Sequence, residues 1–237
     1  MTRLDDLTWP ECRSYVQRDG RLLLPVGTCE QHGPHLPLGT DTLIAEHVAG
    51  WLSEEAAVLV APTVAYGVNL PCDRSFWGTA SVGEPILRAY VGAALEWWRD
   101  QGFRRFFLIS SHGDPFHLAA LRSIEALPRL GGADVRVRDL WEVPLRDLLE
   151  AQEGAGHACE AETSVMLALF PERVRLEAIE DFETPWEQFA PYLRHEKTEP
   201  VPGSPGPQGF PSKATADKGR RIIERIRVHA LAWLSRP

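Results

Sequence analysis

Residues 30–41 read Glu30-Gln31-His32-Gly33-Pro34-His35-Leu36-Pro37-Leu38-Gly39-Thr40-Asp41. A short apolar run at residues 22–27 precedes them and predicts a buried strand, and a helical pattern follows from residue 42. The acids and histidines therefore lie on a loop at the carboxyl end of a strand, where open α/β sheets bind ligands. Carboxylate and imidazole groups together suit Zn, Mn or Fe. For this segment alone, a solvated loop with Asp41 as a helix N-cap is the simpler alternative.

The same arrangement recurs after a second buried strand, predicted over residues 104–111. That strand ends in Ser110-Ser111-His112-Gly113-Asp114-Pro115, where His112 and Asp114 are two residues apart, as Glu30 and His32 are. Asp before Pro is a common turn, so one such loop would be weak support for a site. Because the carboxyl ends of parallel strands meet at one edge of a sheet, the two loops are expected to converge.

A third cluster, His157 with Glu160 and Glu162, lies at the start of a predicted helix. Acids in the first turn of a helix are stabilised by its dipole without any metal, and a histidine there can simply be packed. If the first two loops form a metal site, His157 instead supplies the proton carrier that hydrolysis needs.

The charge of the acids favours two metal ions rather than one. Glu30, Asp41 and Asp114 would bring three negative charges together, and without cations at least one would be protonated. Two divalent ions and a bridging hydroxide would neutralise the cluster, and the ions would lower the pKa of that water toward neutrality. The residue types therefore predict a hydrolytic centre with two divalent ions per chain, of Zn, Mn or Fe.

Strand-like and helix-like segments alternate along the chain. Strands are predicted at 22–27, 57–64, 104–111 and 135–140, and helices at 7–17, 42–55, 84–100, 116–127, 163–170 and 213–235. Residues 66–80 and 196–212 are rich in turn residues. This order predicts one α/β domain over residues 1–237, with a mostly parallel sheet flanked by helices on both faces.

Composition narrows the partners and the compartment. The net charge is −8 and no long basic run is present, which argues against nucleic acid and anionic membrane surfaces as partners. No apolar stretch approaches the length of a membrane span, and the first residues lack the apolar core of a signal peptide. Four cysteines without a paired spacing fit a reducing, cytoplasmic location.

The chain resembles the creatininase family (creatinine amidohydrolase and relatives) over most of its length. The resemblance rests on residues 24–41, on Ser111-His112-Gly113-Asp114, on residues 157–164 and on residues 214–219. It implies a creatininase-like α/β sandwich of parallel strands flanked by helices, usually assembled as a homohexamer. It also implies a dinuclear metal centre that hydrolyses a non-peptide carbon–nitrogen bond.

The resemblance also assigns roles to individual residues. It implies that Glu30, Asp41 and His112 hold one metal ion, and that His32, Asp41 and Asp114 hold the other, with Asp41 as the bridge. Creatininase itself carries Glu at the place of Asp114. His157 matches the family's proton-transferring histidine. Glu162 matches an acid that supports the site, either directly or through a hydrogen bond.

The substrate is less determined. Creatininase proper has a mobile loop with a tryptophan before the matching histidine, and residues 150–156 contain none, so creatinine is not the expected substrate. The resemblance favours a metal-dependent amidohydrolase of a small cyclic amide, amidine or formamide. The alternatives are a peptide-trimming member from cofactor biosynthesis, a non-catalytic metal-binding homologue, and a cysteine amidase that uses Cys29 or Cys159 with His157.

Overall fold

The computed structural model describes residues 2–236. Its centre is a sheet of four parallel strands in the order β2-β1-β3-β4. The strands span Arg21–Val26 (β1), Leu59–Val60 (β2), Arg105–Ser110 (β3) and Asp134–Asp139 (β4). The register pairs Val26 with Ser110 and Ser110 with Asp139, so β1, β3 and β4 end level with one another. The prediction of a mostly parallel sheet is confirmed.

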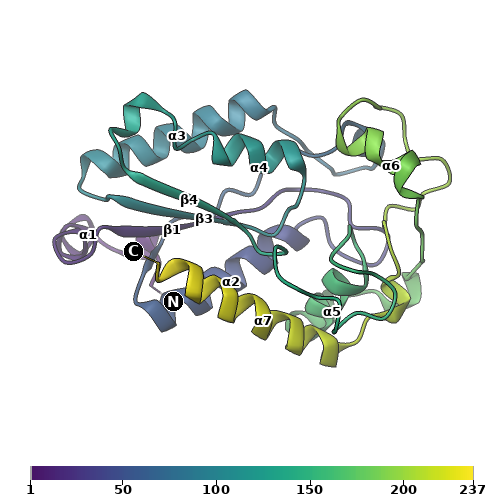
Figure 1. Ribbon diagram of the computed structural model, residues 1–237. Helices are drawn as coiled ribbons and strands as arrows, with labels where there is room; N and C mark the ends of the chain where they lie inside the picture. Colours follow the sequence, from purple (N-terminus) through teal and green to yellow (C-terminus); the bar gives the residue numbers. More distant parts are fainter. Residues whose placement is uncertain (1, 237) are drawn as a thin grey trace.

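Helices cover both faces of this sheet (Figure 1). Helices α3 and α4 lie on one face and α2 and α7 on the other, whereas α6 stands at the opposite end of the molecule from the two termini. None of the helices in residues 2–236 is long and apolar enough to cross a membrane. The helices span Trp9–Val16 (α1), Thr40–Ala56 (α2), Glu84–Asp100 (α3), Pro115–Arg122 (α4), Glu160–Leu169 (α5), Trp186–Leu193 (α6) and Ala216–Leu234 (α7).

The strands supply side chains to two separate hydrophobic cores. Successive side chains of a strand point to opposite faces of the sheet, and in β3 Phe107 packs in one core while Phe106 and Leu108 pack in the other. The first core also takes apolar residues of α2, α5 and α7, and the second takes those of α3 and α4. Both faces of the sheet are therefore buried, as the continuous apolar strands predict.

Four local features differ from the sequence-based predictions. Residues 57–64 pair as a strand only at Leu59–Val60, and Val64 adds an isolated parallel bridge to Val26 after Pro62. Asp41 is not an N-cap; that position is Gly39, and Asp41 lies in the first turn of α2. Helix α5 begins at residue 160 instead of 163, and α6 is not predicted, because it contains an internal proline.

Candidate metal centre

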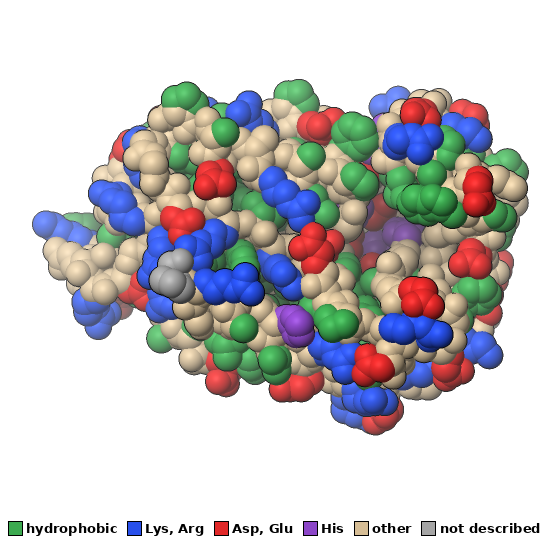
Figure 2. All heavy atoms as spheres, viewed as in Figure 1, with side chains coloured by type: hydrophobic (Ala, Val, Ile, Leu, Met, Phe, Trp, Pro, Cys, Tyr) green, Lys and Arg blue, Asp and Glu red, His purple; other side chains and the backbone are tan. Residues whose placement is uncertain are grey.

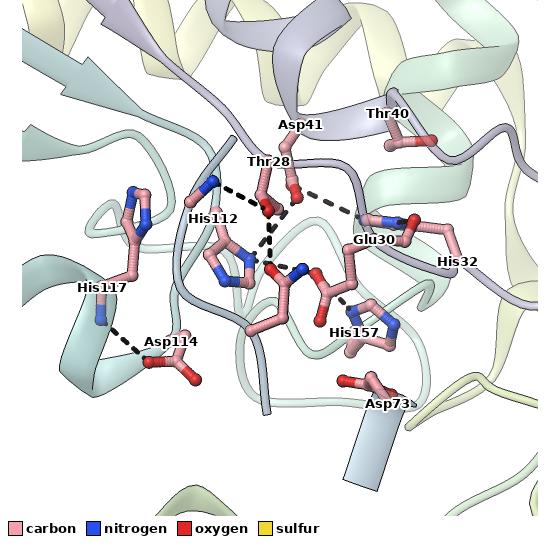
Figure 3. Close-up of polar contacts among 12 residues, drawn as sticks. Thr28, Glu30, His32, Thr40, Asp41, Asp73, His112, Asp114, His117 and His157 are labelled. Carbon is pink, nitrogen blue, oxygen red and sulfur yellow. Dashed lines mark hydrogen bonds and ion pairs between the residues drawn. The ribbon is translucent and has the colours of Figure 1, made fainter. Parts of the chain in front are cut away.

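Five buried side chains converge at the carboxyl edge of the sheet. Figure 3 shows Glu30, His32, Asp41 and His112 close to one another. The loop after β1 carries Glu30 and His32, and the first turn of α2 carries Asp41. The loop after β3 carries His112, and the first turn of α5 carries Glu162. Each residue is at most 6% exposed. Four of the five predicted metal ligands are therefore in this cluster, together with one residue predicted to be catalytic.

A glycine lets α2 begin close to the end of β1. A Cβ atom at Gly27 would lie 2.6 Å from Cα of Thr42, closer than real Cβ atoms approach. This close contact brings Asp41 next to the loop that carries Glu30 and His32.

The five side chains form two groups that share one residue. Glu30, Asp41 and His112 form the first group and His32, Asp41 and Glu162 the second, and in each group the ligand atoms lie within 4.8 Å of one another. His112 Nδ1 is 3.1 Å from Glu30 Oε2 and 3.4 Å from Asp41 Oδ2, and His32 Nε2 is 3.6 Å from Asp41 Oδ1. Ligand atoms at about 2.1 Å from a tetrahedral ion are about 3.4 Å apart. These spacings would suit two metal ions, one held by each group, with Asp41 contributing to both groups.

Hydrogen bonds to the backbone orient both histidines. His32 Nδ1–H donates to the carbonyl of Glu30 at 3.1 Å, and His112 Nε2–H donates to the carbonyl of Val68 at 2.8 Å. The other nitrogen of each ring faces the carboxylates and can take a metal ion or a proton. Glu30 Oε2, His32 Nε2 and Asp41 Oδ2 are buried without a hydrogen-bond partner. Such atoms are costly to bury, and a metal ion would satisfy all three.

The field of the cluster attracts positive charge. Burial alone would lower the pKa of His32, but Asp41 outweighs it and raises this pKa to about 10. Burial alone would raise the pKa of Glu30, but the neighbouring histidines, His112 first, lower it to about 2. Burial raises the pKa of Glu162 to about 8. Because a cation beside a buried carboxyl group stabilises its anion, Glu162 also fits a metal ligand.

His157 forms a third candidate metal-binding group with Glu30 and His32, with the ligand atoms within 4.8 Å of one another. Its ring centroid is 4.6 Å from that of His32, and its Nδ1 is 3.8 Å from Glu30 Oε2. The side-chain N–H of Gln31 donates to His157 Nε2 at 2.8 Å, and Gly33 N–H donates to Gln31 Oε1 at 2.9 Å, which fixes the amide. Burial lowers the pKa of His157 to about 4. The neutral ring therefore carries its proton on Nδ1, which faces the cluster.

Asp114 lies outside the candidate metal-ligand groups of the described residues, so its expected role as a metal ligand stays a prediction. It is the N-cap of α4, with Oδ1 accepting the N–H groups of Phe116 and His117 at 2.7 and 2.9 Å. Its Oδ2 accepts a hydrogen bond from His195 Nε2 at 2.9 Å. The proline that follows starts the helix and makes Asp114 its cap. Glu162 takes the fifth place in the two groups.

The cluster lies at the floor of a cavity of about 620 Å³. Glu30, His112, His157 and Glu162 line its inner part, and α6 with the loop before it forms part of the outer wall. Figure 2 shows the hollow beside this part of the molecule, with a histidine side chain visible inside it. A molecule bound in the cavity would therefore reach the candidate metal ligands directly.

The cysteines give no support to a thiol nucleophile. Among the described residues that line the cavity, neither Cys29 nor Cys159 occurs, whereas Cys72 does. Burial raises the pKa of both Cys72 and Cys159 to about 12, which keeps these thiols protonated.

Comparisons with known proteins identify the family. The family model for creatinine amidohydrolase matches residues 5–234. The chain belongs to the creatininase family. The mycofactocin precursor peptide peptidase of Mycolicibacterium smegmatis is 36% identical over 216 residues, which is 86% of this chain and 80% of that protein. The creatinine amidohydrolase of Pseudomonas putida is 28% identical over 238 residues, covering 92% and 90% of the two chains.

Solved structures agree with this assignment to the creatininase family. A crystal structure of creatinine amidohydrolase is 25% identical and superposes with a TM-score of 0.82, covering 98% of this chain and 96% of the other. A Zn–Zn form of a creatininase variant (26% identical, 98% and 96% covered) and a Mn form of creatininase (25%, 98% and 97%) each give a TM-score of 0.81. The creatininase-like sandwich expected from the sequence is therefore confirmed.

Two residues of this creatininase-family site have no role in the sequence-based interpretation. Gln31 lies inside the first motif, but only the structure reveals its hydrogen bond to His157. Asp73 is 4% exposed, lines the cavity and accepts a hydrogen bond from Gln31 at 3.1 Å. It belongs to a short 3₁₀ turn, Pro71–Ser75, within a segment that has no periodic signal.

Proposed function

We propose that this creatininase-family protein is a metal-dependent hydrolase that cleaves an amide bond. Two divalent ions would be held by Glu30, Asp41 and His112, and by His32, Asp41 and Glu162. The observation that carries the proposal is the set of buried, unpartnered ligand atoms, arranged in two groups that share Asp41. The mixture of carboxylate and imidazole ligands accepts Zn, Mn or Fe.

The residues around the ions have separable tasks. Bound divalent ions supply an activated water and polarise the scissile carbonyl. Glu30, Asp41 and Glu162 neutralise their charge. His157 presents its Nδ1 proton toward the cluster and donates it in a hydrogen bond to the leaving nitrogen of the substrate. Gln31 keeps that proton on Nδ1 by donating to Nε2.

We propose that the amide belongs to a peptide. The relative named as a peptidase is 36% identical to this chain, against 28% for the creatinine amidohydrolase. The cavity, at about 620 Å³, is in the range that takes ligands larger than a single small ring. Residues 150–156 also lack the tryptophan of creatininase proper. A small-molecule amide is the second candidate, on the similarity to creatinine amidohydrolase.

The test compares metal-depleted and metal-restored protein. Chelated protein is reloaded with Zn²⁺, Mn²⁺ or Fe²⁺ and incubated with unblocked short peptides, creatinine and formamides, and products are read by mass spectrometry. We expect peptide cleavage that needs metal and is lost in Asp41→Asn. Asp217→Asn is the matched control, because Asp217 also lies in the first turn of a helix but is exposed. Cleavage of creatinine alone would select the second candidate, and no cleavage would favour the non-catalytic alternative.

A homo-oligomer, with the hexamer implied by the resemblance, is also part of this proposal. It is supported by Ile86, Tyr90 and Trp97, which lie on one side of α3 and are all at least 62% exposed. We expect light scattering to give a mass several times that of one chain, and Tyr90→Asp to lower it. A monomeric wild-type protein would contradict this part of the proposal.

A further inference from the structure

The cavity beyond the candidate metal ligands carries negative charge only. Within residues 2–236, no Lys or Arg side chain lines it. Two divalent ions would balance Glu30, Asp41 and Glu162 together with an activated water. Asp114 is bonded to His195. The cavity wall therefore keeps carboxylates that neither the metal centre nor a basic side chain of the protein neutralises.

Asp139 is the best defined of these carboxylates. It is the last residue of β4, the strand next to β3, whose following loop carries His112. It is 8% exposed and lines the cavity. Its Oδ1 accepts the backbone N–H of Trp141 at 2.9 Å, which fixes the side chain. Its Oδ2 has no hydrogen-bond or ion-pair partner in the described part of the chain.

The indole of Trp141 is fixed as well. Its Nε1–H donates to the carbonyl of Ser111 at 2.7 Å, so the wall beside Asp139 is preformed. Burial raises the pKa of Asp139 to about 6, because the more distant positive charges of His112 and Arg122 do not offset the loss of water. A bound molecule that supplies the opposite charge would stabilise the ionised form of this carboxyl group.

We propose that Asp139 is a specificity-determining residue that binds a protonated amine of the substrate. The inference rests on the proposed function, because the scissile amide is taken to lie over the metal ligands. The substrate would then extend along the edge of the sheet, from the loop after β3 to the end of β4. A peptide with a free amino group near the scissile bond has this chemistry. A carboxylate at the same place would face Asp139 without any basic side chain to bind it.

Hydroxamates test this without knowledge of the natural substrate, because their metal-binding group anchors them at the ions. The probes are acetohydroxamate and three series of increasing chain length that end in an amine, a methyl group or a carboxylate. Dissociation constants are measured by calorimetry on metal-loaded protein. We expect one amino hydroxamate to bind at least about tenfold more tightly than its methyl counterpart, the effect of one charge-assisted hydrogen bond. The carboxylate series should bind most weakly.

Asp139→Asn keeps the shape and the acceptor for Trp141 and should abolish the amine preference. Asp134→Asn, at the other end of β4, is the matched control and should retain it. Thermal unfolding followed by circular dichroism establishes that both variants fold. If Asp139→Asn does not fold, Asp139→Ser replaces it in the test. An equal affinity for amine and methyl probes, or a preference that survives in Asp139→Asn, would overturn the inference while leaving the hydrolase proposal intact. If acetohydroxamate itself fails to bind metal-loaded protein, the proposed metal centre fails.

Discussion

Replacing Glu162 and Asp114 in turn by their amides tests which acid completes the second metal site. Glu162→Gln removes a buried anion from the group formed with His32 and Asp41. We expect the metal content of this variant to fall from two ions per chain to one. Asp114→Asn should retain both ions, because the Asp114 oxygens already bond to α4 and to His195.

The structure sets the size of both effects. Asn caps a helix as well as Asp does, so Asp114→Asn keeps the bonds to the N–H groups of α4 through its amide oxygen. Its amide NH₂ group replaces Oδ2 and cannot accept from His195 Nε2, so the variant loses the hydrogen bond to His195. This loss is worth about 1–2 kcal/mol, or a melting temperature lower by about 2–8 °C in a chain of this size. Loss of a residue that only hydrogen-bonds to a metal ligand lowers metal affinity roughly 10–100-fold. We expect Glu162→Gln to lower the affinity for the second ion by more than this, because it removes a proposed ligand.

The assay is elemental analysis of each protein after gel filtration without chelator, with thermal unfolding followed by circular dichroism. The reasoning is refuted if Asp114→Asn loses an ion while Glu162→Gln keeps two. That result would mean that Asp114 leaves its cap and His195 when metal binds. Loss of both ions in both variants would instead show that the two sites cannot be filled independently.

Asp139→Asn should stabilise the metal-free protein by up to about 3 kcal/mol above pH 6 and by nothing below pH 4, because a pKa of about 6 makes ionisation unfavourable in the folded state. Urea unfolding above pH 6 and below pH 4 checks this. An equal increase in the free energy of unfolding at both pH values would contradict it. Lys218→Met leaves the buried Glu160 without its 2.6 Å ion pair, and should cost about 3 kcal/mol in urea unfolding; a change under about 0.5 kcal/mol would show that backbone donors suffice. Gln31→Glu replaces a hydrogen-bond donor by an acceptor, so the proton of the neutral His157 ring should move to Nε2. We expect kcat to fall about tenfold or more. If nitrogen NMR showed an unchanged His157 tautomer, the positioning role of Gln31 would be contradicted.

The sequence alone was enough to predict the parallel sheet and to bring most of the candidate metal ligands together. Strands β1 and β3 are continuous apolar runs, and each is followed at once by polar residues on a glycine- and proline-rich loop. Parallel strands bring such loops together at one edge, so local patterns were sufficient for Glu30, His32, Asp41 and His112. The strand predicted over residues 57–64 is limited to Leu59–Val60. Helix α6 was not predicted, because it contains an internal proline.

Only the tertiary structure shows that Glu162, and not Asp114, lies among the candidate metal ligands. In the sequence, Asp114 has the better pattern, since it lies two residues after His112, as His32 lies after Glu30. Its direction, however, is set by the free N–H groups of α4 and by His195, which lies 81 residues further along the chain. The position of Glu162 likewise depends on how α5 packs near the edge of the sheet. The charge of Asp139 stays unpaired because no basic side chain among the described residues reaches it. Such contacts between distant residues leave no local pattern, because burial and partners are fixed only when the chain is folded.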